Sequence, residues 1–203
     1  MALDEALLET AAIRACAVLR AYEWTHACAT FGYGQRHADA AAATPLRPLI
    51  RRISGGGVVP HGADWTYSLT FPPDHPWAAM TAAESYQQLH TWLRDALAAM
   101  GLPTTLADDC RRPRQGECFA GHERHDLLWR GQKIAGAAQR RNRMGLLIQG
   151  SLQPQLSWCR PDWIGAMQSV SSGNWRVMEN PPLARARELA QIKYATAAHQ
   201  QRL

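Results

Sequence analysis

The chain has 203 residues, a formal net charge of +5 and 46% hydrophobic residues, which is an ordinary globular composition. This composition excludes disorder, collagen and coiled coil, and no window reaches the roughly 18 consecutive apolar residues that a membrane-spanning helix needs. Asp4 and Glu5 stand where a signal peptide would carry positive charge. We therefore expect a cytoplasmic protein with no membrane partner.

The first part of the chain contains patterns for one helix and three strands. Residues 65–71 alternate aromatic or aliphatic side chains with Thr66, Ser68 and Thr70, which predicts a strand with a core face and a polar face. The other expected elements are a helix over 2–15, strands over 18–24 and 30–34, and a surface connection over 38–48.

The rest of the chain contains patterns for two helices and three strands. Thr81 and Glu84 have the form of a capping box that begins a helix over 82–100. The other expected elements are strands over 126–130 and 133–137 that turn at Arg130 and Gly131, a strand over 145–150 and a terminal helix over 183–203. Strands and helices are interleaved unevenly along the chain, which predicts an α+β (mixed α/β) fold with a mixed sheet, in a single domain.

The most unusual segment reads RRISGGGVVPH, from Arg51 to His61. Three consecutive glycines favour a backbone that adopts positive φ or approaches a ligand closely. The N–H groups of such a loop can bind an anion, and the two preceding arginines strengthen that preference. A flexible hairpin turn beside a solvated basic pair is the alternative. The segment is not a Walker A loop, because no Gly-Lys-Ser/Thr follows it.

A second segment runs from Cys118 through Asp126 to GQKIAGAAQRR, where Lys133 stands among small apolar residues. Such a lysine either reaches solvent or faces a negative or polarised partner. Cys118 is one of five cysteines, and it is either an inert buried thiol or a thiolate favoured by nearby cations. His122 and His125 follow it, but the spacing matches no standard zinc site, so we expect no metal.

Together, RRISGGGVVPH, DWTYSL, CF and GQKIAGAAQRRNRMGLLIQGS resemble the lipoate-protein ligase and octanoyltransferase family, which shares its catalytic fold with biotin-protein ligases. The resemblance extends over nearly the whole chain. It implies a mixed sheet flanked by helices, with a tunnel for the acyl chain. It also implies one catalytic domain over residues 1–203 with no C-terminal accessory domain.

The resemblance implies roles for individual residues. Cys118 falls where one octanoyltransferase branch carries its nucleophile, and Lys133 matches the lysine that contacts the acyl carbonyl. The loop around the three glycines matches the segment that closes over the acyl group. The implied substrate-binding residues are Arg51, Arg52, Ser54, Gly55, Gly56, Gly57, His61, Ala135 and Gly136.

The implied reaction moves an octanoyl group from octanoyl-acyl carrier protein, through a thioester on Cys118, to a lysine of a lipoyl domain. The acceptors are lipoyl domains of 2-oxoacid dehydrogenases or the glycine-cleavage H protein. Because one thioester exchanges for another, this reaction needs no cofactor. A basic surface suits acidic protein partners, and no DNA- or RNA-binding pattern surrounds the basic clusters, so we expect no nucleic acid.

Two alternatives stay open at this point. The first is an ATP-dependent lipoate-protein ligase, because the triple glycine resembles the ligases more than the Gly-Gly-Arg of many transferases. Such a ligase would use ATP and Mg to form lipoyl-AMP. The second alternative is a binding module for lipoyl domains or carrier proteins that has no catalytic activity and in which Cys118 is inert.

Overall fold

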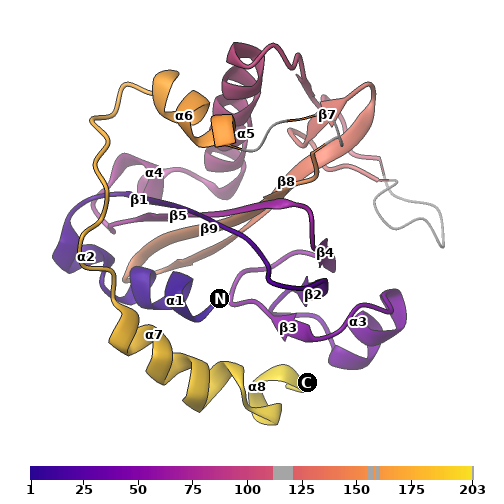
Figure 1. Ribbon diagram of the computed structural model, residues 1–203, viewed down its shortest axis with the longest axis vertical. Coiled ribbons are helices and arrows are strands. Elements are labelled where there is room, and N and C mark those ends of the chain that lie inside the picture. Colours follow the sequence, from indigo (N-terminus) through magenta and orange to yellow (C-terminus); the bar gives the residue numbers. More distant parts are fainter. Residues whose placement is uncertain (112–120, 155–157, 159–160, 203) are drawn as a thin grey trace. The chain divides into compact units, whose positions relative to one another are not determined.

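The computed structural model describes residues 1–111, 121–154, 158 and 161–202 (Figure 1). The chain divides into two compact units. The first unit comprises Met1–Ala79, Ala137–Ser151 and Met178–Leu203, and the second comprises Met80–Gly136 and Leu152–Val177. The expected α+β class is confirmed, because strands and helices alternate irregularly along the chain.

The larger sheet of the first unit has the strand order β1-β5-β9-β8. Its strands are β1 (Val18–Tyr22), β5 (Trp65–Phe71), β9 (Gly145–Leu152) and the second half of β8 (Gln132–Asn142). Strands β1 and β5 pair antiparallel. Helix α1 (Ala2–Glu9) packs against β5, and α7 (Leu183–Leu189) lies beside α1 (Figure 1). Two helical layers therefore support this sheet.

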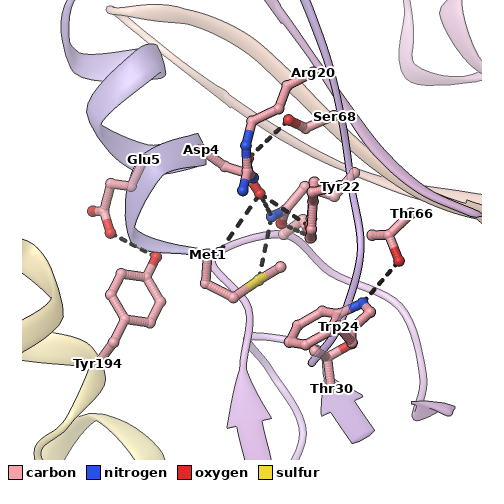
Figure 2. A network of polar contacts seen from close by, with 12 residues as sticks. Met1, Asp4, Glu5, Arg20, Tyr22, Trp24, Thr30, Thr66, Ser68 and Tyr194 are labelled. Atoms are coloured by element: carbon pink, nitrogen blue, oxygen red, sulfur yellow. Dashed lines mark hydrogen bonds and ion pairs between the residues drawn. The ribbon is translucent and has the colours of Figure 1, made fainter. Parts of the chain in front are cut away.

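Strand β5 has the predicted bounds, but its polar face is not at the surface, because all seven of its residues are buried. The hydroxyl of Ser68 donates to Asp4, which projects from α1, and Arg20 of β1 donates to the same carboxylate at 2.6 Å (Figure 2). The polar alternation therefore indicates a buried hydrogen-bond network beneath α1.

A second sheet has the order β3-β2-β4 and is mixed, as expected. Strand β2 (Cys28–Phe31) pairs parallel with β3 (Leu49–Arg51) and antiparallel with β4 (Val59–His61). The sequence patterns did not reveal β3 and β4, because three-residue strands are too short to show alternation. The connection expected over 38–48 is wrong at its start, where alanine-rich α3 (His37–Ala43) forms.

The second unit combines α5 (Ala82–Ala99) and α6 (Pro161–Ser169) with strands β6 (Thr105–Leu106), β7 (Leu127–Trp129) and the first half of β8. The predicted capping box is confirmed, because the Thr81 hydroxyl accepts from the Glu84 amide and the Glu84 side chain accepts from the Thr81 amide. Arg130 and Gly131 both have positive φ, as a two-residue hairpin turn requires.

The two terminal helices are interrupted. The helix expected over 2–15 is α1 followed by α2 (Ala11–Arg14), and the Thr10 hydroxyl between them donates to the Ala6 carbonyl. The helix expected over 183–203 is α7, a π-helical turn η1 (Ala190–Tyr194) and α8 (Ala197–Gln200). A short helix α4 (Pro76–Ala79) was not expected. Within the described part of the chain, no helix combines the length with the apolar content that crossing a bilayer requires.

Candidate active site

Residues 52–57, called the glycine loop below, connect β3 to β4 in the first unit. The Arg52 amide donates to the Phe31 carbonyl and the Tyr33 amide donates to the Ser54 carbonyl, both at 2.9 Å. Between these bonds, a Cβ at Gly32 would lie 2.0 Å from the Gly56 carbonyl oxygen. The loop therefore requires glycine at position 32 as well as within its own sequence.

The three glycines of the loop have different roles. Gly56 has φ +84°, which is left-handed backbone that favours glycine. A Cβ at Gly55 or Gly57 would meet no described atom within 4 Å. Only the middle glycine is thus required by the backbone, and its two neighbours leave open space along the loop.

Arg52 holds the glycine loop closed. One Nη1–H donates to the Thr30 hydroxyl at 2.7 Å, and Nη2 donates to the carbonyls of Gly55 and Gly57 at 2.8 Å each. The side chain is 5% exposed, and no carboxylate among the described residues pairs with it. Burial lowers the pKa of Arg52 to about 10. The loop therefore surrounds a buried cation whose partners are all uncharged oxygens.

Ser54 connects the loop to the buried carboxylate of Asp4. Its hydroxyl donates to Oε1 of Gln149 at 2.7 Å, and Nε2 of Gln149 donates to Asp4 at 2.7 Å. Burial opposes ionisation of Asp4. The pKa of Asp4 is nevertheless lowered overall by the positive charges of the N-terminal amino group and Arg20, and by hydrogen bonds from Ser68 and Gln149. An ionised Asp4 thus fixes the orientation of Gln149 and, through it, that of Ser54.

Arg51, also predicted to bind substrate, points to the C-terminal segment. Its Nε donates to the His199 carbonyl, Nη1 donates to the Tyr33 and Gln35 carbonyls, and Nη2 donates to the Gln200 and Arg202 carbonyls. A guanidinium has five N–H donors, and these contacts engage all five. The geometry therefore favours a structural role for Arg51 as the anchor of residues 199–202.

His61 is buried, and both of its ring nitrogens have partners. Nδ1 lies 2.8 Å from Asp64, and Nε2 lies 2.8 Å from the Thr30 hydroxyl. The Trp24 ring stacks on the imidazole with 4.4 Å between centroids. His61 therefore belongs to the support behind Arg52.

In the second unit, Lys133, Asp126 and Tyr86 form what we call the lysine cluster. Lys133 Nζ lies 2.6 Å from Asp126 Oδ2, and the Tyr86 hydroxyl and the Glu123 amide also donate to this carboxylate. Asp126 is fully buried, whereas the side chain of Lys133 is 21% exposed. The lysine is therefore not a solvated outer-face residue, and its ammonium is held at one position.

The small residues after Lys133 make room for its side chain. A Cβ at Gly136 would lie 3.0 Å from Lys133 Cε and 3.1 Å from Nζ. Ala135 is buried in the same strand, and its neighbour Ile134 accepts a hydrogen bond from the Gln153 amide. Gly136 thus allows the lysine side chain to fold back over β8 towards Asp126.

His90 lies in α5 beside the lysine cluster. Its Nδ1 faces the Tyr86 carbonyl at 3.0 Å, and its Nε2 has no hydrogen-bond partner among the described residues. Burial lowers the pKa of His90 to about 4, more than the nearby charge of Asp126 raises it. The imidazole is therefore neutral near pH 7 and does not compete with Lys133 for Asp126.

The structure gathers the predicted site residues into two separate groups. Arg52, Ser54 and the glycines belong to the first unit, and Lys133, Ala135 and Gly136 belong to the second. Cys118 lies outside the described residues, so its catalytic role stays a prediction. Residues that the sequence analysis did not identify are Gly32, Thr30, Gln149, Asp64 and Tyr86. Only Gly32 carried a local signal, as a glycine inside the strand expected over 30–34.

Comparison with known proteins gives a consistent result. Residues 1–158 match the model of the family described as lipoyl protein ligase A/B catalytic domain. The chain is 34% identical over 165 residues to octanoyltransferase LipM of Bacillus cereus and 32% identical over 165 residues to that of Staphylococcus epidermidis. These matches cover 75% of this chain, but only 59% and 60% of the two relatives.

Solved structures share the fold. A crystal structure of lipoate-protein ligase A bound with ATP superimposes with a TM-score of 0.74 at 18% identity, covering 98% of this chain and 92% of that one. A bi-partite lipoate protein ligase from Thermoplasma acidophilum gives a TM-score of 0.64 at 17% identity, covering 98% and 91%. At these identities the likeness shows the fold and nothing further.

The anchoring role of Arg51 predicts a loss of stability from a conservative change. Arg51→Lys keeps the charge but offers three donors to five carbonyls, so we expect the free energy of unfolding to fall by about 2 kcal/mol. Urea denaturation measures this loss, and hydrogen exchange should show faster exchange in residues 197–202. Arg36→Lys, at an exposed position, is the control. Arg51→Lys with parental stability and a raised KM would instead indicate contact with substrate.

Burial of His90 predicts an acid-dependent loss of stability. Its pKa is about 4 in the folded chain and near 6.5 in the unfolded chain, so the unfolded state binds an extra proton between these values. Protonation of His90 in the unfolded state has little effect on stability above pH 6.5. At pH 5 it should lower the free energy of unfolding by about 2 kcal/mol. We expect His90→Leu to show a smaller stability difference between pH 7 and pH 5 than the parent. The exposed-site variant His26→Leu should keep the parental stability difference. The same difference in all three proteins would contradict the prediction.

Proposed function

Because the chain belongs to the lipoyl protein ligase A/B catalytic domain family, we propose that it is an octanoyltransferase of protein lipoylation. Curated relatives named octanoyltransferase LipM, at 34% and 32% identity, support this activity. The observation that carries the proposal is the fixed ammonium of Lys133, on a partly exposed side chain, fifteen residues after Cys118 in the sequence.

In the proposed reaction, the Cys118 thiolate attacks the thioester carbonyl of octanoyl-acyl carrier protein. The tetrahedral intermediate collapses, the carbon–sulfur bond to the carrier breaks, and the carrier leaves as a thiolate while octanoyl-Cys118 forms. A lysine amine of the acceptor then attacks this second thioester, an amide forms, a proton leaves the amine, and Cys118 is released. No ATP is consumed, because the acyl group is already activated as a thioester.

The lysine cluster suits the role of oxyanion stabiliser. An ammonium has three N–H donors, and the ion pair with Asp126 orients one of them. A donor that is already fixed loses little entropy when the oxyanion forms, so it stabilises the transition state more than a mobile lysine would. Asp126 supplies this fixation, and the Tyr86 hydroxyl and the Glu123 amide keep the carboxylate itself in place.

The proposed partners are octanoyl-acyl carrier protein as donor and a lipoyl domain as acceptor, of a 2-oxoacid dehydrogenase or of the glycine-cleavage H protein. The formal charge of +5 favours encounter with such acidic proteins. We also propose that the protein acts in the cytoplasm, where a reducing environment keeps a nucleophilic thiol free. No metal or cofactor takes part in this scheme.

An ATP-dependent lipoate-protein ligase is the second candidate, and Arg52 favours it. A buried cation with only uncharged partners is suited to a phosphate oxygen as well as to an acyl oxygen. The structural relative bound with ATP shares the fold. In this scheme ATP, with Mg, would activate free lipoate, and Cys118 would have no covalent role.

Substitution of Cys118 separates these candidates. The parent protein, incubated with octanoyl-acyl carrier protein and no ATP, should gain one octanoyl group on Cys118, which intact-mass and peptide mass spectrometry detect. Cys118→Ala should lose the adduct and acyl transfer, whereas Cys110→Ala, at an exposed thiol, should keep both. ATP-dependent lipoylation that persists in Cys118→Ala would establish the ligase. Neither activity in the parent would indicate a binding module.

Substitution of Lys133 tests the oxyanion role. Lys133→Met removes the ammonium, and we expect kcat to fall by about a hundredfold or more. The same change leaves Asp126 buried and unpaired, which should destabilise the fold by about 3 kcal/mol. The double variant Lys133→Met/Asp126→Asn removes both charges and should recover stability but not turnover. Recovery of turnover in the double variant would mean that Lys133 acts only on folding.

A further inference from the structure

A buried chain of hydrogen bonds ends at Arg52. Asp64 accepts from His61 Nδ1, His61 Nε2 faces the Thr30 hydroxyl, and the same hydroxyl accepts from Arg52 Nη1 at 2.7 Å. The chain joins β4, β2 and the glycine loop, all within the first unit. Asp64, His61 and Thr30 are 2%, 6% and 0% exposed. No part of this chain except its Arg52 end therefore reaches a ligand in the loop.

Counting donors and acceptors fixes the direction of every bond in the chain. Arg52 can only donate, so the Thr30 oxygen accepts from it, and the Thr30 proton is free to go to His61. Nε2 of His61 then accepts and Nδ1 carries the hydrogen, which it donates to Asp64. If Nε2 carried the hydrogen instead, the Thr30 proton would have no acceptor among the described residues.

Asp64 is held as a carboxylate at the far end of the chain. Burial opposes its ionisation, but hydrogen bonds from His61, Ser151 and Thr66 lower the pKa of Asp64 overall. Thr66 in turn accepts from the indole of Trp24, whose ring stacks on His61 (Figure 2 shows the Trp24–Thr66 bond). The orientation of the imidazole is thus fixed from its edge by Asp64 and from its face by Trp24.

We propose that His61 is a positioning residue, which acts through Thr30 to set the orientation of the Arg52 guanidinium over the glycine loop. The proposal rests on the proposed function, together with the role that the family resemblance implies for this loop, which is to close over the octanoyl group. The two Nη2 bonds to Gly55 and Gly57 hold one edge of the guanidinium, and the bond from Nη1 to Thr30 fixes its rotation. Both ring nitrogens of His61 are engaged within the protein, as this role requires.

The proposal predicts a spectroscopic signature that does not depend on activity. Long-range proton–nitrogen NMR of the parent should assign His61 as the tautomer with hydrogen on Nδ1. Arg52 side-chain signals should show slow rotation of the guanidinium in the parent and in Thr30→Ser, which keeps the hydroxyl. Thr30→Val has nearly the same shape but no hydroxyl, and its Arg52 should rotate faster. Hydrogen on Nε2 of His61, or equal rotation in all three proteins, would overturn the proposal.

Kinetics tests whether this orientation matters to the substrate. Thr30→Val loses a hydrogen bond to a charged group, so we expect KM for octanoyl-acyl carrier protein to rise about tenfold or more. A loop that contacts the acyl group equally before and during reaction affects KM rather than kcat. A merely destabilised protein would show lower kcat at unchanged KM, because only the fraction of active enzyme falls. Thr30→Ser should largely restore the parental KM.

A double-mutant cycle isolates the connection to Arg52. If Thr30 acts through Arg52, Thr30→Val should have little further effect on KM when Arg52→Lys is already present. His61→Leu should raise KM as Thr30→Val does, and His61→Gln, which keeps an acceptor towards Thr30, should recover part of the loss. Additive effects of Thr30→Val and Arg52→Lys would refute the connection. A parent with no octanoyl transfer would refute the proposed function alone, because the NMR comparison still decides the positioning role.

Discussion

The glycine loop depends on a buried guanidinium that is bound only by uncharged oxygens. Removing a cation from water is unfavourable, and hydrogen bonds to hydroxyl and carbonyl oxygens compensate for part of that loss without cancelling the charge. Arg52 therefore keeps a positive potential inside the loop while the bonds to Thr30, Gly55 and Gly57 fix the path of the backbone. The close approach at Gly32 and the left-handed backbone at Gly56 are the steric conditions for this arrangement.

Two buried carboxylates support this loop without touching its cation. Asp4 acts on Ser54 through Gln149, and the link from Asp64 to Arg52 passes through His61 and Thr30. A direct ion pair would fix Arg52 more strongly, but it would also neutralise the charge that a phosphate or acyl oxygen can use. Neutral residues between each carboxylate and the loop fix the orientation of the loop's side chains and leave the charge of Arg52 available. The sequence does not reveal this arrangement, because Gln149 is 95 residues from Ser54.

Local signals predicted the elements whose determinants lie within a few residues. The capping box of Thr81 and Glu84 and the turn at Arg130 and Gly131 are of this kind, and both formed as predicted. Strands β3 and β4 were missed because their stability comes from pairing with β2, which short sequences do not reveal. The site residues show the same limit of local signals. The sequence identified the loop and Lys133, but the structural role of Arg51 depends on carbonyls at positions 199–202, which only the folded chain brings near.

The cations Lys133 and Arg52 have opposite electrostatic environments, and the proposed chemistry gives a reason. Lys133 pairs directly with Asp126, so the cluster adds little net charge and acts mainly through a directed N–H donor. The oxygen of a thioester carbonyl is uncharged before attack and negative only in the transition state. A fixed donor of low net charge does not bind the ground state strongly, yet it stabilises the charge that develops, which is the condition for raising kcat. Arg52, unpaired by any described carboxylate, instead favours oxygens that are polar or negative from the outset, as binding requires.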